Sequence, residues 1–268
     1  MTRPLPPPRP DWPFFAALGL IGGLYAGLVL AMLAADLLAT SPADLARAFA
    51  SPAIRAAVWL SLVSCTAAAV LSVWVGVPLG YLLSRTRFPG RAALEVLLDV
   101  PIVLPPLVVG LSLLVLFQTA PGAWVERHVG PVTYAVPAVV VAQFAVTAAF
   151  AVRVMRVTFD GIDPRAEAVA RSLGCTRAGA FWRVTLPEAR RGVLTAFTLA
   201  WAKALGEFGP VLVFAGATRG RTEVLATSVF LELSVGHLEA ALAVSFLMIG
   251  VAVAVLIVTR VFGLRGVA

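Results

Sequence analysis

The sequence predicts an all-α, polytopic membrane protein, and three observations support this fold class. The 268-residue chain is 60% hydrophobic and only 13% charged, with a mean hydropathy of +0.95. A soluble domain has roughly 25% charged residues. Apolar runs near 20 residues recur along the chain, which is about the length needed to cross 30 Å of hydrocarbon. The formal net charge of +7 is therefore attributed to loops on one side of a membrane rather than to nucleic-acid binding.

Six membrane-spanning helices are expected after a proline-rich tail. Residues 1–13 are predicted to be a disordered cytoplasmic tail, and residues 14–268 a single transmembrane domain. The expected spans cover about 14–35, 54–83, 92–119, 132–152, 192–217 and 240–262. The first is longer than the roughly 7–15 residues of a signal-peptide core, so it is expected to be retained. In it Gly19, Gly23 and Gly27 form a small-residue face on which a neighbouring helix can pack closely.

Two of the expected spans carry helix-breaking residues. The third contains PIVLPPLVVG, residues 101–110, whose prolines free backbone groups that must be satisfied inside the bundle or by water. The fifth contains WAKALGEFGPVLVFAG, residues 201–216, in which Lys203 and Glu207 lie one helical turn apart. Ionisable groups inside a membrane are costly and are candidates for function. The alternative is that this pair merely holds the bundle together near the cytoplasmic edge.

The distribution of arginines predicts which side each loop faces. Lys203 is the only lysine, so the other 20 basic residues are arginines. With the N-terminus inside, 15 of them fall in inner segments and five in outer loops. This asymmetry favours cytoplasmic N- and C-termini. It also places the long polar insert, residues 153–191, in the cytoplasm.

The insert contains the signals of a helix pair. Asp163 is a candidate N-cap, Pro164 suits the first helical position, and Gly174 is placed to end the helix. Thr176 is a candidate cap for a second helix, which Pro187 should interrupt. The first helix carries a stripe of apolar residues, Ala166, Val169, Ala170 and Leu173. On another face, Glu167 and Arg171 are expected to form an i, i+4 ion pair. This amphipathic helix could lie on lipid, pack on the protein's own spans, or dock in a groove of a soluble partner.

The insert resembles the cytoplasmic loop of permease subunits of binding-protein-dependent ABC importers. That family's pattern is Glu-Ala-Ala, three residues, Gly, nine residues, Ile, one residue, Leu-Pro. Here Gly174 is followed after nine residues by Val184, and then by Leu186 and Pro187. The front of the motif departs from the pattern, because Glu167 lies seven residues before Gly174 and Val169 stands within the alanine pair.

The resemblance implies that residues 167–174 form a coupling helix seated in a cleft of a separate ATPase subunit. Glu167 and Arg171 would make polar contacts there, while Ala168, Val169 and Gly174 would permit close approach. ATP-driven closure of two ATPases would bring two such loops together and turn the permease outward. Hydrolysis would return it to the inward-facing state.

LPPLVVG in the third span and ALGEFGPVLVFAG in the fifth resemble the molybdate/tungstate permease branch, to which sulfate/thiosulfate permeases are related. The resemblance implies a homodimer in the cell membrane, surrounded by lipid, with these spans lining a central path. The residues implied for this path are Pro105, Pro106, Gly110, Lys203, Gly206, Glu207, Gly209 and Pro210. An external binding protein would deliver the oxyanion, and Arg219 and Arg221 would attract it at the outer mouth.

The chain is not expected to be an enzyme or to bind a cofactor or metal. A phosphate-binding loop needs Gly-Lys-Ser/Thr, and the single lysine lies between Ala202 and Ala204, so ATP and Mg²⁺ are assigned to the partner ATPase. The pair of histidines, His128 and His237, are far apart and lack ligand-like neighbours. Cys65 and Cys175 are expected at different depths, which argues against a disulfide.

Three alternatives remain open. A secondary carrier is expected to show more buried ionisable groups or repeats between its halves. An integral-membrane enzyme needs a nucleophile, a metal cluster or an acid/base pair. The third alternative keeps the ABC permease and changes the cargo to sulfate, thiosulfate, a polyamine, ferric ion or another small solute.

Overall fold

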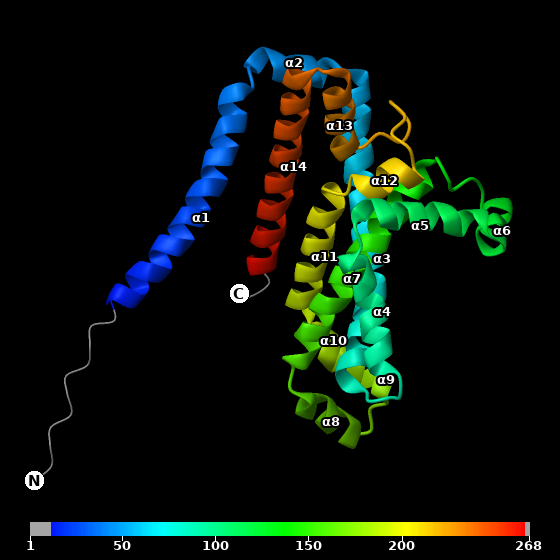
Figure 1. Ribbon diagram of the computed structural model, residues 1–268. Helices are drawn as coiled ribbons and strands as arrows, with labels where there is room; N and C mark the ends of the chain where they lie inside the picture. The colour runs from blue at the N-terminus through cyan, green and yellow to red at the C-terminus, as the bar shows by residue number, and fades with distance from the viewer. Residues whose placement is uncertain (1–11, 266–268) are drawn as a thin grey trace, which may run out of the picture.

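The computed structural model describes residues 12–265, and its regular elements are helices (Figure 1). In chain order they are α1 (Trp12–Ala39), α2 (Pro42–Ala50), α3 (Pro52–Arg85), α4 (Arg91–Val103), α5 (Pro106–Gln118), α6 (Ala120–His128), α7 (Val136–Asp160), α8 (Pro164–Ser172), α9 (Arg177–Ala180), the π-helix η1 (Phe181–Thr185), α10 (Leu186–Glu188), α11 (Arg190–Leu205), α12 (Gly209–Phe214), α13 (Leu225–Val235) and α14 (Leu238–Arg265). The expected disordered tail lies outside the described residues, apart from Trp12 and Pro13, which begin α1.

Among the described residues, four helices are long and apolar enough to cross a membrane: α1, α3, α7 and α14. The pair α4–α5 raises the number to five if it is counted as one span. The helical membrane bundle is confirmed, and of the six expected spans the described residues support four or five by length and hydropathy. The expected third and fifth spans are both interrupted.

The break in the expected third span comes from its prolines. Leu104 and Pro105 are extended, with ψ of 137° and 135°, and α5 starts at Pro106. A residue before proline is pushed out of the helical region, and each proline lacks the N–H that would continue the ladder. The axes of α4 and α5 consequently differ by 112°. Figure 1 shows α5 lying across the bundle instead of along it.

The expected fifth span is divided between α11 and α12. α11 ends at Leu205 after 16 residues, and α12 begins only at Gly209. Gly206 is the C-cap residue of α11, and Pro210 occupies the first turn of α12. A residue without an N–H is tolerated in the first turn, so the sequence restarts a helix here after the break.

The centre of the bundle is the packing of α3 against α7. A Cβ at Gly76 would lie 3.0 Å from the Ala151 carbonyl carbon, and one at Gly80 would lie 2.7 Å from the Met155 Cβ. The two helices therefore touch through glycines, as small residues allow between membrane helices. By contrast, Gly19, Gly23 and Gly27 have nothing within 4 Å of the position of a Cβ. α1 stands beside the bundle, and its large apolar side chains are exposed (Figure 1).

Candidate functional site

The insert forms the expected helix pair, and its capping follows the sequence signals. The Asp163 carboxylate accepts a hydrogen bond from the Arg165 N–H at 2.9 Å, and Pro164 is the first residue of α8. Gly174 has φ +92°, and Cys175 N–H donates to the Ala170 carbonyl at 3.1 Å, which closes the helix end in a left-handed turn. Before Pro187 the chain widens into η1, and the α-helix resumes at Leu186.

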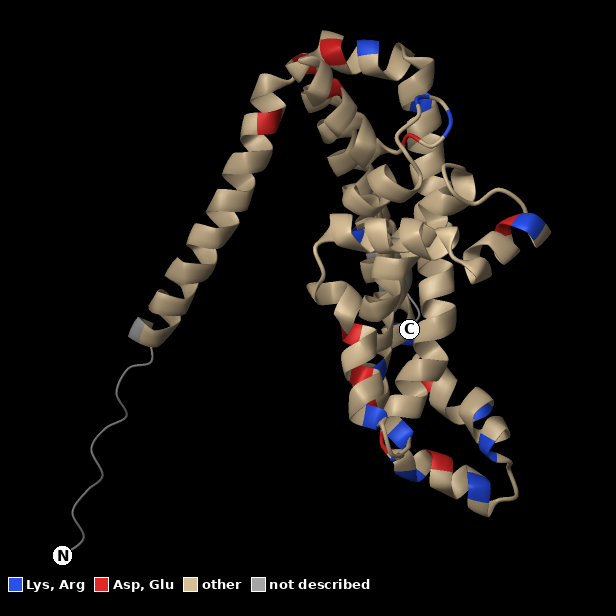
Figure 2. Cartoon of the chain, turned by 45° about the vertical axis from the view of Figure 1, so that its right-hand side comes forward, with Lys and Arg blue, Asp and Glu red and all other residues tan. Residues whose placement is uncertain are grey.

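The apolar stripe of α8 is exposed. Val169 is 59% exposed and Leu173 82%, and Trp182 on the following helical segment is 66% exposed. α8 lies at the far end of the molecule, beyond the end of α14 (Figure 1). Arginines surround it on the same end (Figure 2). The stripe itself therefore does not pack on the spans in the part of the chain that the structure describes.

Glu167 faces in the opposite direction from this stripe. Its side chain is buried, and its residue is only 8% exposed. Glu167 accepts a hydrogen bond from the Tyr81 hydroxyl of α3 at 2.7 Å and one from the Thr185 hydroxyl of η1 at 3.2 Å. The expected ion pair with Arg171 is absent from the contacts of the described residues, because the carboxylate is turned toward α3. Of the coupling residues predicted on α8 itself, Ala168, Val169 and Arg171 are exposed.

The two broken spans meet each other. A Cβ at Gly110 of α5 would lie 2.8 Å from Pro210 Cα of α12, and one at Gly209 would lie 3.0 Å from Leu107 N. Pro106 lies in the same contact, with its Cβ 3.0 Å from the position of a Cβ at Gly209. Four of the predicted path residues, Pro106, Gly110, Gly209 and Pro210, are thus brought together, and Pro105 forms the adjoining break. The segments are about 100 residues apart in sequence.

Lys203 and Glu207 form an ion pair, as the alternative interpretation of these residues expects. Glu207 is 1% exposed, whereas the Lys203 side chain is 41% exposed. Beside the pair, the Gln143 side-chain amide of α7 donates to the Ala204 carbonyl at 3.2 Å. Gln143 was not singled out from the sequence, although a glutamine in an apolar span is itself a signal for interhelical hydrogen bonding. Gly206 has no side chain of another helix near its Cβ position.

At the opposite end from α8, the two predicted outer-mouth arginines differ. Arg219 forms an ion pair with Glu232 at 2.5 Å, and the other Glu232 oxygen lies 3.2 Å from His237 Nδ1. Arg221 is exposed. The charge of Arg219 is therefore largely compensated within the chain, and Arg221 is the freer of the two to attract an anion.

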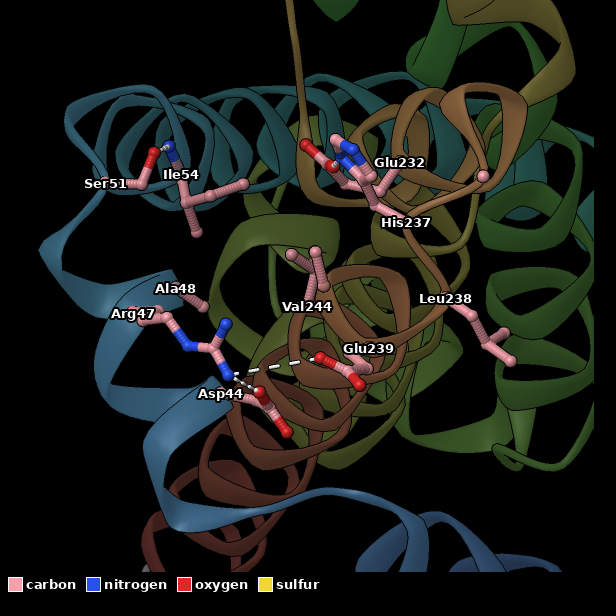
Figure 3. Close-up of a pocket in the computed structure, with 12 residues that line it drawn as sticks. Asp44, Arg47, Ala48, Ser51, Ile54, Glu232, His237, Leu238, Glu239 and Val244 are labelled. Atoms are coloured by element: carbon pink, nitrogen blue, oxygen red, sulfur yellow. Dashed lines mark hydrogen bonds and ion pairs between the residues drawn. The ribbon is translucent and has the colours of Figure 1, made fainter.

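A pocket of about 630 Å³ lies between α2, the start of α3 and the turn from α13 to α14 (Figure 3). Its charged lining residues are Asp44, Arg47, Glu232, His237 and Glu239. Arg47 bridges Asp44 at 2.5 Å and Glu239 at 4.0 Å. Hydrogen bonds from the Ser41 hydroxyl and from the Ser41 backbone N–H lower the pKa of Asp44. Carboxylates outnumber arginines here, so the pocket disfavours an oxyanion. Among the residues that the structure describes, no group of His, Cys, Asp and Glu is arranged to hold a metal ion.

These features define a class of protein: a multi-pass helical membrane protein with broken helices at its centre and an exposed amphipathic helix at one end. The chain belongs to the family of binding-protein-dependent transport system inner membrane components, whose sequence pattern matches residues 76–265. It is the permease component of an ABC transporter and not itself the ATPase. It is accordingly a multi-pass inner membrane protein.

Named relatives and a solved structure agree with this family. A probable molybdenum ABC transporter permease protein of Haloferax volcanii is 36% identical over 244 residues, covering 91% of this chain and 88% of its own. The sulfate transport system permease protein of Escherichia coli is 33% identical over 197 residues, covering 73% and 71%. A bacterial alginate ABC transporter has the same fold, with a TM-score of 0.75, 17% identity and 95% of both chains covered.

Proposed function

We propose that this chain is the transmembrane subunit of an ATP-driven importer for molybdate or tungstate. The observation that carries the proposal is the exposed apolar stripe of α8, set among arginines at one end of a permease of this family. An exposed apolar patch with a polar rim is typical of a protein–protein contact. A soluble ATPase is the partner that such a permease requires.

The proposed orientation places α8 in the cytoplasm. The arginine count puts the insert and both termini on that side. The interrupted third and fifth spans complete six crossings in this arrangement, because each consists of two shorter helical pieces. The pocket beside α2 then lies on the outer face, where an external binding protein would deliver the solute.

Two copies of the chain are proposed to enclose the path. α1 carries a glycine face whose Cβ positions have nothing within 4 Å among residues 12–265, and α5 exposes apolar residues such as Leu107, Leu111 and Val115. Both surfaces are suited to contact with a second copy. The path would run beside the α5–α12 contact, where the helix ladders are interrupted at Pro105–Pro106 and at Gly206–Gly209. Backbone N–H groups that flank such breaks, on residues other than proline, can bind an anion in a site shielded from lipid.

In the proposed transport cycle, the partner ATPases supply the energy and the permease provides the path. ATP and Mg²⁺ bind to two partner ATPases, whose closure brings the two α8 helices together and opens the path outward. Hydrolysis separates the ATPases and returns the path to the cytoplasmic side. Lys203 and Glu207, a pair that joins two turns beside the break, would hold α11 in register during this change.

The oxyanion class is supported by the relatives. One is named for molybdenum and another for sulfate, so two different oxyanion systems resemble this chain at 33–36% identity. Sulfate or thiosulfate is therefore the second candidate cargo. The alginate transporter shows that the fold by itself does not select the solute.

The experiment that tests the function is uptake by the reconstituted system. The chain, its ATPase and its binding protein are placed in proteoliposomes, and molybdate, tungstate and sulfate uptake is measured with and without ATP. ATP-dependent uptake of molybdate or tungstate, with sulfate at least about tenfold less effective, is expected. Uptake that is independent of ATP would indicate a secondary carrier instead.

Docking is tested separately by Leu173→Asp. The side chain is 82% exposed, so the change should leave the unfolding temperature of the chain within about 2 °C of the wild type. The same change should abolish co-purification of the ATPase, because a charge in an apolar contact must be desolvated. Ser172→Asp, one residue away on the same exposed helix, is the matched control for added charge. Equal loss of ATPase from both variants would contradict docking by the stripe.

A further inference from the structure

The carboxylate of Glu167 joins three elements that are distant in sequence. One oxygen accepts a hydrogen bond from Tyr81 on α3, 86 residues earlier, and the other from Thr185 on η1, 18 residues later. Glu167 itself belongs to α8. One side chain thus ties the exposed helix to the end of a membrane-spanning helix and to the segment that leads into α11.

The hydrogen-bond partners of Glu167 are themselves fixed by close packing. The Tyr81 ring packs edge-on against Phe159 of α7 at 5.5 Å and against Phe181 of η1 at 4.7 Å, between ring centroids. Phe159 is fully buried. Arg85, one turn further along α3, donates to the Ile162 carbonyl between α7 and α8 at 2.7 Å. The anchor of Glu167 is therefore a packed unit formed by α3, α7 and η1, and not a mobile side chain.

The two faces of α8 consequently have different partners. Val169, Arg171 and Leu173 point outward and are available to a docked protein, whereas Glu167 is 8% exposed and points inward. A buried carboxylate that accepts from two hydroxyls is costly to leave without them. Glu167 has little accessible surface with which to reach an ATPase unless these bonds break.

We propose that Glu167 is a positioning residue that transmits displacement of α8 to α3 and η1, and that it does not bind the ATPase. This inference rests on the proposed function and deepens it. The outward face of α8 receives the force of the ATPase, and the Tyr81–Glu167–Thr185 hydrogen bonds convey it to the membrane spans. Loss of the tie would leave the ATPase bound while its ATP hydrolysis drives less transport.

The decisive comparison is between Glu167→Ala, Glu167→Gln and Tyr81→Phe. Glutamine can accept from Tyr81 through its oxygen and donate to Thr185 through its nitrogen, so it keeps both connections without the charge. Alanine removes both connections, and Tyr81→Phe removes one. Glu188→Gln, on an exposed residue of the insert, and Tyr25→Phe, on exposed α1, are the matched controls.

The first measurement is transport per ATP hydrolysed, together with the Kd of the ATPase for the permease. Glu167→Ala and Tyr81→Phe should each lower transport per ATP about tenfold, as expected for loss of a hydrogen bond to a charged group. The Kd should change less than about twofold, and Glu167→Gln should remain close to the wild type. The double variant Glu167→Ala/Tyr81→Phe should be no worse than Glu167→Ala, because both act on one connection. A Kd raised equally by Glu167→Ala and Glu167→Gln, with Tyr81→Phe normal, would show direct charge contact with the ATPase and overturn the proposal.

The second measurement needs no ATPase. Hydrogen exchange of the α8 amides in the full-length chain should accelerate about tenfold in Glu167→Ala and Tyr81→Phe, and not in Glu167→Gln or the controls. Unchanged hydrogen exchange in Tyr81→Phe would show that the Tyr81–Glu167 hydrogen bond does not hold α8, and would overturn the proposal whatever the transport result. If the variants show the expected exchange pattern but the wild-type chain binds no ATPase, the role of these hydrogen bonds stands and the proposed function fails.

Discussion

The contact between α5 and α12 gives the sharpest test of the broken-helix centre, through the substitution Gly110→Ala. The added Cβ would lie 2.8 Å from Pro210 Cα and 3.0 Å from the Pro210 carbonyl oxygen. Ordinary contacts of a Cβ begin at 3.4 Å, so the two helices must move apart by several tenths of an ångström. The obstructing atoms are the Cα and carbonyl oxygen of Pro210 and the Cβ of Val213, none of which can move away by a side-chain rotation. Both short helices must shift as a result.

The magnitude follows from overpacking. Forcing a methyl group into a filled contact costs about 1–3 kcal/mol of unfolding free energy. At about 2–4 °C per kcal/mol for a domain of this size, the unfolding temperature should fall by roughly 2–12 °C. Gly27→Ala is the control, because nothing lies within 4 Å of its Cβ position and alanine favours a helix over glycine by up to about 1 kcal/mol.

The assay is thermal unfolding of both variants in the same detergent, followed by transport in proteoliposomes. Gly110→Ala should be less stable than Gly27→Ala and should transport more slowly. A Gly110→Ala variant as stable and active as Gly27→Ala would show that α5 and α12 are not in close contact in the functional protein. The placement of the path beside that contact would then fall as well.

Two further predictions concern Gly174 at the end of α8 and the Lys203–Glu207 ion pair at the end of α11. Gly174→Leu places a side chain at φ +92° in otherwise open space, so it should cost about 1–2 kcal/mol through backbone strain and reorient the end of α8; the chain should stay folded in membrane but fail to bind or stimulate its ATPase, and normal co-purification would refute the docking assignment. Lys203→Met leaves Glu207 buried without its cation and should lower the free energy of unfolding by up to about 3 kcal/mol, a cost that is moderated because the Lys203 side chain is 41% exposed. Denaturation should show that Lys203→Met/Glu207→Gln recovers part of this stability. A double variant as unstable as Lys203→Met would contradict a stabilising pair.

Local rules predicted the insert well because its helix signals act over a few residues. The caps at Asp163 and Thr176 and the left-handed Gly174 depend only on neighbouring backbone groups. The continuity of the membrane spans was less predictable, because a hydropathy profile does not distinguish one long apolar helix from two short apolar helices in succession. The prolines of the third span were noted, yet only the structure shows that α4 and α5 differ in direction by 112°.

Contacts between residues distant in sequence determine the features that could not be predicted from the sequence. Gly23 and Gly80 are equally small, but only Gly80 meets another helix of the same chain. Glu167 was expected beside Arg171 on the basis of spacing, and its actual partner Tyr81 lies 86 residues away. A helix-surface rule cannot anticipate a hydroxyl that tertiary packing brings to the opposite face.

The positions of the two helix breaks explain why motion can be confined to the centre of the bundle. α4 is fixed to α7 by ion pairs, Arg153 with Asp99 at 2.8 Å and Arg156 with Glu95 at 3.2 Å. α5 is packed on α12, and apolar residues of both helices also pack against α7. The chain passes from one group to the other at Leu104–Pro105 and at Gly206–Phe208, where no continuous helix has to bend. Relative movement there breaks few helix hydrogen bonds, so it costs less than bending an intact span. A force delivered to α8 and carried by α3 and α7 would therefore be expressed as movement beside the α5–α12 contact, which is where the proposed path lies.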